Sequence, residues 1–234
     1  MPIPAKTVVG AAALAVAAAL AISPLIGHAE SATALPRPAV DAPLTKGSLQ
    51  TAVLSGGCFW GVQGVFQHVK GVKKVYSGYA GGAAGTAQYE TVSTGSTGHA
   101  ESVQITYDPS QVSYGELLRV YFSVAHNPTE LNYQGPDHGT QYRSNIWYMN
   151  DEQKRIAAAY IAQLDKAHAF PRKIVTRVDP YKGFYRAEGY HQDYLIHNPT
   201  NPYIVINDLP KIADLKRVLP EDYRGTPVMV TPAS

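Results

Sequence analysis

The sequence has almost no cysteine: Cys58 is the single cysteine among its 234 residues. Because a disulfide needs two thiols, an internal disulfide framework is excluded, and packing must stabilise the fold. A thiol that has no partner for a cross-link is free for chemistry, so the residues around Cys58 matter most for function.

The chain also lacks an excess of charge of either sign. It carries 20 lysines and arginines against 18 aspartates and glutamates, a formal net charge of +2. Neither a basic surface for nucleic acid nor a patch for a membrane surface is indicated, so we expect no nucleic-acid partner. The sequence shows no internal repeat.

Charged residues are almost absent from the N-terminus, where Lys6 is the only one before position 30. Residues 8–22 are nearly all Ala, Val, Leu and Ile, and small residues lead up to Ala29. This pattern predicts that residues 1–29 are a signal peptide cleaved after Ala29. The alternative is an uncleaved anchor, since residues 8–26 have about the length that spans a bilayer core. Either way we expect export, to the periplasm, with membrane attachment if the segment is retained.

Composition divides the rest of the chain into three parts. Residues 30–47 are rich in Ala, Pro and Thr without sustained periodicity and are interpreted as a linker. Residues 48–224 alternate apolar segments with turn signals, as a globular domain does, and residues 225–234 form a tail. The length of the middle part suits a single domain with a sizeable core.

Apolar periodicity predicts strands and helices that are mixed along the domain without strict alternation. The expected strands are residues 51–55, 72–79, 100–107, 145–149 and 174–178. The expected helices begin at residue 58 and at the capping box of Ser113 and Glu116, and cover residues 151–168, 187–197 and 210–219. This order favours an α+β fold, a two-layer mixed sheet with helices packed on it.

Cys58 lies between glycines, after a buried strand and at the start of a helix. The helix presents one apolar stripe, formed by Phe59, Val62, Val65, Phe66 and Val69. Unpaired amides and the helix dipole favour an anion at this position and lower a thiol pKa from its usual ~8.5. We therefore expect a reactive thiol; the alternative is a buried and inert cysteine.

Glu101 is the second informative residue. In the alternating strand of residues 100–107 it shares a face with Val103 and Ile105, which places a carboxyl at the edge of the core. Burial raises a glutamate pKa from ~4.3, and a neutral carboxylic acid near pH 7 can act as a general acid. The alternative is a glutamate at a strand end that faces solvent or pairs with a lysine.

Four motifs occur in order at compatible spacing and resemble those of the peptide methionine sulfoxide reductase A family. They are Gly57-Cys58-Phe59-Trp60-Gly61, Thr97-Gly98-His99-Ala100-Glu101, the run from Gln134 to Ser144, and Tyr190-His191-Gln192-Asp193-Tyr194. The resemblance extends from about Thr51 to Arg224. It implies reduction of methionine S-sulfoxide, free or in oxidised proteins, as a repair of oxidative damage.

The resemblance also implies roles for individual residues. Cys58 attacks the sulfoxide sulfur and becomes a sulfenic acid, while Glu101 acts as the acid on the sulfoxide oxygen. The implied partners of that oxygen are Tyr89 and Tyr142, and Asp137 belongs to the same polar network. Phe59 and Trp60 match the pair that forms an apolar slot for the substrate methyl group. The implied chemistry uses no cofactor and no metal.

Two residues depart from the family pattern. Many members carry further cysteines that resolve the sulfenic acid, and Ser93 stands where some relatives have one. An external thiol, either a thioredoxin-like protein or a small thiol, must therefore reduce Cys58. The family motif usually continues to a glutamate where this chain has Gln63, and we expect this change to alter local polarity while leaving the attack intact.

Other functions remain as alternatives on sequence alone. His99, His138 or His191, oriented by an aspartate, would suit a cysteine–histidine hydrolase. His191, Asp193 and His197 invite a metal site, although only Asp193 and His197 share a helical face. A domain that binds oxidised methionine without turnover is the third alternative.

Overall fold

The computed structural model describes residue 1 and residues 32–231. The predicted signal peptide or anchor, residues 1–29, lies outside the described residues except for its first residue. Between residues 32 and 231, no helix combines the length and the apolar character needed to cross a membrane.

One six-stranded sheet forms the centre of the domain, with its strands in the order β7-β6-β1-β3-β2-β8. The strands are β1 (Gln50–Ser55), β2 (Val72–Ala80), β3 (Ala100–Tyr107), β6 (Asn145–Tyr148), β7 (Arg177–Pro180) and β8 (Phe184–Arg186). Neighbours pair antiparallel except β6 and β7, which pair parallel. The short strands β4 (Tyr133–Gln134) and β5 (Asp137–His138) form a separate hairpin.

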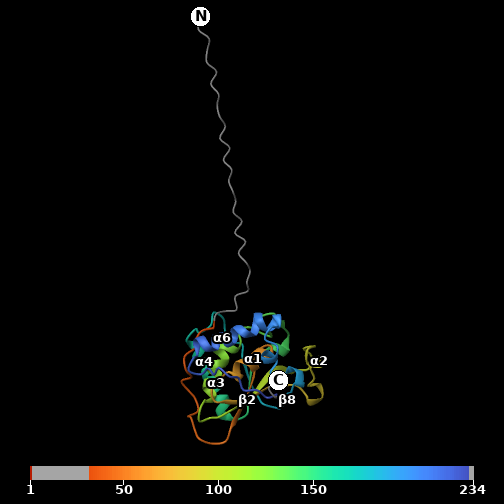
Figure 1. Ribbon diagram of the computed structural model, residues 1–234. Helices are drawn as coiled ribbons and strands as arrows, with labels where there is room; N and C mark the ends of the chain where they lie inside the picture. The colour runs from red at the N-terminus through yellow and green to blue at the C-terminus, as the bar shows by residue number, and fades with distance from the viewer. Residues whose placement is uncertain (2–31, 232–234) are drawn as a thin grey trace.

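The α-helices are α1 (Phe59–Gln67), α2 (Tyr89–Val92), α3 (Tyr114–Val120), α4 (Asp151–Lys166), α5 (Tyr194–His197) and α6 (Leu209–Val218). The π-helical turn η2 (Tyr121–Ala125) extends α3, and η5 (Ile204–Asp208) leads into α6. Three 3₁₀ turns complete the list: η1 (Ala84–Thr86), η3 (Thr140–Tyr142) and η4 (Gly189–His191). In Figure 1, α3 and α4 lie on the opposite side of the molecule from α2. This α+β arrangement on a mixed sheet confirms the predicted fold class.

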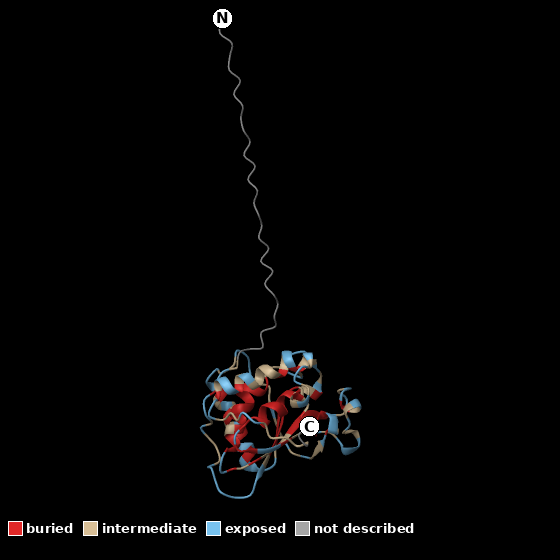
Figure 2. Cartoon of the chain, viewed as in Figure 1, coloured by how far each residue is buried: buried red, intermediate tan, exposed pale blue. Residues whose placement is uncertain are grey.

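The core is formed by the sheet together with α1, α3 and α4, and Figure 2 shows the buried segments at the centre of the domain and on the side of α3 and α4. The apolar stripe predicted for the first helix is fully buried, and α1 packs against β2 and β3. Helix starts follow the expected capping chemistry: the Ser113 hydroxyl accepts a bond from the Glu116 amide at 3.1 Å, which begins α3. Asn150 caps α4 in the same way, through the Gln153 amide at 2.8 Å.

Two predicted elements are wrong in position or type. The strand predicted at residues 174–178 begins only at Arg177, because the parallel pairing with β6 fixes its register. The helix predicted at residues 187–197 is replaced by η4 and α5, because Asp193 between them has a left-handed backbone with φ 54°. Residues 204–206 belong to the π-helical turn η5.

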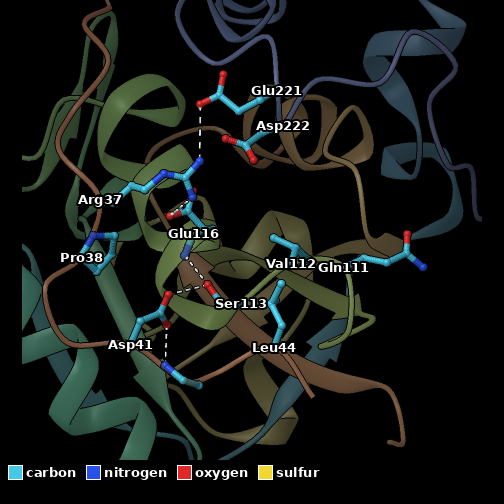
Figure 3. Close-up of a pocket in the computed structure, with 11 residues that line it drawn as sticks. Arg37, Pro38, Asp41, Leu44, Gln111, Val112, Ser113, Glu116, Glu221 and Asp222 are labelled. Carbon is cyan, nitrogen blue, oxygen red and sulfur yellow. Dashed lines mark hydrogen bonds and ion pairs between the residues drawn. The ribbon is translucent and has the colours of Figure 1, made fainter. Parts of the chain in front are cut away.

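Residues 32–47 have no regular secondary structure but lie against the domain, which their composition did not indicate. Leu35 is buried, and its carbonyl accepts a hydrogen bond from Arg119 Nε at 2.8 Å. The Asp41 carboxylate accepts a hydrogen bond from the Ser113 hydroxyl (Figure 3) and a second one from the Gly115 amide at the start of α3. This segment therefore holds a fixed place along α3.

The same segment borders a surface cavity of about 480 Å³. Figure 3 shows Arg37, Pro38 and Asp41 on one side of it, with Glu116 and Glu221 close to Arg37. Arg37 pairs with Glu116 at 3.0 Å and with Glu221 at 3.8 Å. None of the predicted site residues lines this cavity, so it is separate from the candidate active site.

Candidate active site

Cys58 is the N-cap residue of α1 and follows β1 through two glycines. Gly57 has φ 85°, which favours glycine, and a Cβ on it would lie 2.6 Å from the Gln134 side chain. The second glycine, Gly56, makes room in the same way for His126. These glycines let the segments around residues 126 and 134 approach the cysteine closely, and Cys58 remains partly exposed.

Glu101 is buried beside the first turn of α1. It is only 4% exposed, and its Oε2 accepts a hydrogen bond from the Phe59 amide at 3.0 Å. That bond fixes the carboxyl against the residue that follows Cys58. Burial raises the pKa of Glu101 to about 8, with smaller contributions from Asp137 and Asp208, while the Phe59 amide lowers it. The prediction of a carboxylic acid that is neutral near pH 7 is confirmed.

The Cys58 thiol differs from the sequence prediction. Burial raises its pKa well above the usual range, and the negative charges of Glu101, Asp208 and Asp137 raise it further. The Trp60 amide at the helix start acts in the expected direction and lowers the pKa, but its effect is smaller. The predicted lowering is therefore wrong for the free protein: the sulfur is a neutral thiol at pH 7.

Three further predicted residues converge on the same space from different elements. Burial raises the phenol pKa of Tyr89, at the start of α2, and that of Tyr142, at the end of η3. Both phenols also interact electrostatically with Glu101 and Cys58. Asp137 in β5 acts on the same pair, and burial raises its pKa. The structure thus brings together Cys58, Glu101, Tyr89, Tyr142 and Asp137.

Two site residues were missed in the sequence. The Tyr203 hydroxyl donates a hydrogen bond to Asp137 Oδ2, and its phenol interacts electrostatically with Cys58. Asp208 is completely buried, and its negative charge acts on both Cys58 and Glu101. Neither residue belongs to one of the four motifs, so no sequence signal pointed to them.

Aromatic rings surround the first turn of α1. Trp60 stacks on Tyr194 with ring centroids 3.8 Å apart, and its indole N–H donates to His191 Nδ1 at 3.1 Å. Phe59 is fully buried and packs against His191 with centroids 5.0 Å apart. Trp60 is half-buried and retains open surface. Of the pair expected to hold the substrate methyl group, Trp60 therefore offers more exposed surface.

Two of the other histidines, His99 and His197, have structural partners. His99 Nδ1 accepts a bond from the Gly82 amide at 3.2 Å, and its Nε2 lies 3.0 Å from the Ala83 carbonyl oxygen, which shapes the glycine-rich loop. Asp193 and His197 both bind Thr231 near the C-terminus, at 2.6 and 2.9 Å. These contacts account for His99, Asp193 and His197 among the residues that had suggested a hydrolase or a metal site. Across residues 32–231, no three metal-ligating side chains gather around one point.

Gln63, where the family pattern has a glutamate, is buried and uses both ends of its amide. Its Nε2 donates to the Val75 carbonyl at 2.8 Å, and its Oε1 accepts from the Asp193 amide at 2.9 Å. The side chain therefore ties α1 to β2 and to the turn before α5, and it makes no bond to Cys58.

Known proteins resemble this chain over most of its length. The family model described as peptide methionine sulfoxide reductase matches residues 50–222. Peptide methionine sulfoxide reductase MsrA 2 of Mesorhizobium japonicum is 65% identical over 185 residues, covering 79% of this chain and 95% of the relative. A protein of the same description from Synechocystis sp. is 48% identical over 186 residues, covering 78% of this chain and 87% of the relative.

Two solved structures share the fold. Mxr1 from Saccharomyces cerevisiae in reduced form matches with a TM-score of 0.58 and 32% identity, covering 68% of this chain and 94% of that one. Methionine sulfoxide reductase A of Corynebacterium diphtheriae matches with a TM-score of 0.56 and 31% identity, covering 76% and 93%. The chain therefore belongs to the peptide methionine sulfoxide reductase family.

Proposed function

We propose that this protein, an oxidoreductase of that family, reduces methionine S-sulfoxide to methionine, either free or in oxidised proteins, with Cys58 as nucleophile. The observation that carries the proposal is the hydrogen bond from the Phe59 amide to Glu101 Oε2 at 3.0 Å. It holds an acid that is protonated at pH 7 next to the only sulfur nucleophile of the chain.

The chemistry balances within this set of residues. The Cys58 sulfur attacks the sulfoxide sulfur as Glu101 gives its proton to the sulfoxide oxygen, which makes the substrate sulfur a better electrophile. The attack forms a bond between the two sulfur atoms. That bond and the substrate S–O bond then break as the oxygen, with its proton, moves to the Cys58 sulfur, so methionine leaves and Cys58 becomes a sulfenic acid. The proton of the thiol replaces the one that Glu101 gave. Donors from Tyr89 and Tyr142 stabilise the developing charge on oxygen.

Reduction of the sulfenic acid needs an external thiol, because the chain has no second cysteine. One thiol displaces water to form a mixed disulfide with Cys58, and a second thiol releases Cys58 and leaves as a disulfide. A small thiol and a thioredoxin-like protein both supply this chemistry.

The experiment that tests the function uses both epimers of methionine sulfoxide with excess dithiothreitol. We expect the S epimer alone to be consumed and Cys58→Ser to be inactive with an unchanged fold. Turnover by Cys58→Ser would contradict the role of Cys58. An ester substrate is the control for hydrolase activity, and its cleavage without loss of sulfoxide would favour the hydrolase instead.

We also propose that the protein is exported to the periplasm. The apolar run of residues 8–22 and the small residues before position 30 support this proposal. The mass of the mature N-terminus, measured together with cell fractionation, tests it. A chain that begins at Glu30 in the periplasmic fraction is the expected result, a full-length membrane-bound chain indicates the anchor, and a full-length cytoplasmic chain contradicts export.

A further inference from the structure

Asp208 is a buried carboxylate that the reaction scheme above does not use. It is completely buried at the end of η5, and its Oδ1 pairs with Lys211 Nζ in α6 at 3.1 Å. Its Oδ2 is buried and has no hydrogen-bond partner among residues 32–231. A buried carboxylate oxygen that accepts no hydrogen bond destabilises a fold. Packing alone therefore does not explain why Asp208 occupies this position.

The carboxylate lies against the first turn of α1. A Cβ added to Gly61 would come 2.0 Å from Asp208 Oδ1 and 2.9 Å from Lys211 Nζ, so only glycine leaves space for this pair. Gly61 is the third helical residue after the N-cap residue Cys58. In a capping box the side chain at this third position reaches back toward the N-cap residue. Asp208 is distant from Gly61 in the sequence. Its carboxylate nevertheless occupies the space that a side chain at position 61 would fill.

We propose that Asp208, held by Lys211, is a positioning residue of the reductase that keeps Cys58 a neutral thiol until substrate occupies the site. The inference rests on the proposed role of Cys58 as nucleophile. The thiolate and not the thiol is the reactive form of cysteine, so a nearby negative charge suppresses reaction of the resting enzyme with other electrophiles. Electrostatics agree with the geometry, since Asp208 raises the pKa of the Cys58 thiol.

Other charged groups act on the same thiol and must stay constant in a test. The carboxyls are Glu101 from β3 and Asp137 from β5, and the phenols that interact with Cys58 are Tyr89, Tyr142 and Tyr203. Asp208 itself faces Lys211 and Asp137. Replacing Asp208 by asparagine removes one charge and keeps the shape, without touching any of these groups.

The test is the pH dependence of Cys58 alkylation by iodoacetamide in the resting enzyme, followed by intact mass. For Asp208→Asn we expect a midpoint lower by about one pH unit, and thus alkylation about tenfold faster at pH 7. The matched control is Asp214→Asn, which breaks a similar pair with Arg217 on the same helix, and its midpoint should equal that of the wild type. Lys211→Arg retains the charge pair and should also leave the midpoint in place.

An unchanged or higher midpoint in folded Asp208→Asn would overturn the proposal. If that variant does not fold, Asp208→Ser, which is smaller and equally neutral, replaces it with the same expected shift. Alkylation requires no turnover, so this readout is independent of sulfoxide reduction. Activity in Cys58→Ser would instead refute the proposed function, whatever the midpoint of Asp208→Asn.

Discussion

Replacing the buried acid by its amide, Glu101→Gln, should make the protein more stable and less active. Burial raises the pKa of Glu101 to about 8, from 4.5 for an ordinary glutamate. Between these two pH values the unfolded chain releases a proton that the folded protein retains. Below pH 4.5 the carboxyl therefore does not change the free energy of unfolding. As the pH rises from 4.5 to 8, the carboxyl lowers the free energy of unfolding progressively.

The magnitude follows from these two pKa values. At 1.36 kcal/mol per pKa unit, the cost of retaining the proton is about 1 kcal/mol at pH 5 and about 4 kcal/mol at pH 8. Glutamine has no proton to lose and can still accept the bond from the Phe59 amide. Glu101→Gln should therefore exceed the wild type in free energy of unfolding by these amounts, while its turnover should fall by about 10² to 10⁴ because the general acid is lost.

Urea unfolding at pH 5 and pH 8, with turnover of the S-sulfoxide measured on the same samples, checks both halves of this prediction. Glu152→Gln is the matched control, because Glu152 is exposed in the first turn of α4 and its loss uncovers no buried group. A stability difference for Glu101→Gln that does not grow with pH would mean that the folded protein holds an ionised carboxylate, which refutes the reasoning.

Two other substitutions test separate parts of the site. Gln63→Glu removes the donor to the Val75 carbonyl and places a second carboxylate near Asp193, so urea unfolding should show a loss of about 1–3 kcal/mol; equal stability would contradict the structural role of Gln63. Tyr142→Phe removes one donor expected at the sulfoxide oxygen, so kcat should fall about 10²-fold with little change in KM. A change confined to KM would mean that Tyr142 binds the ground state only.

The positions of the two central residues were predictable because local patterns determine them. Alternation along β3 places Glu101 on the buried face, and the apolar stripe of α1 places Cys58 at the helix start. The pKa of Glu101 follows from that burial. Neither prediction needed knowledge of distant segments.

The electrostatics of the thiol were not predictable in this way. The sign of the pKa change at Cys58 depends first on burial and then on carboxyls from separate elements, Glu101, Asp208 and Asp137. Helix position alone argued for the opposite sign, and only the fold shows that burial and these charges prevail. Tyr203 was missed for the same reason, since its partner Asp137 lies 66 positions away in the chain.

Tertiary contacts also decided the elements that were misplaced. The register of β7 is determined by parallel pairing with β6, which apolar content around Ile174 does not reveal. The left-handed backbone at Asp193 breaks the expected helix, and the side chain there binds the Val230 and Thr231 amides at 3.0 and 2.8 Å. Local periodicity carries no information on either contact.

The most direct test of the account is a reaction with excess methionine S-sulfoxide in the absence of any thiol. Because Cys58 is the only cysteine, we expect a rapid formation of one methionine per chain and a gain of one oxygen atom on Cys58, after which the reaction stops. Continued turnover without a reductant, or oxygen found on another residue while Cys58 stays reduced, would contradict the assignment of Cys58 as the nucleophile.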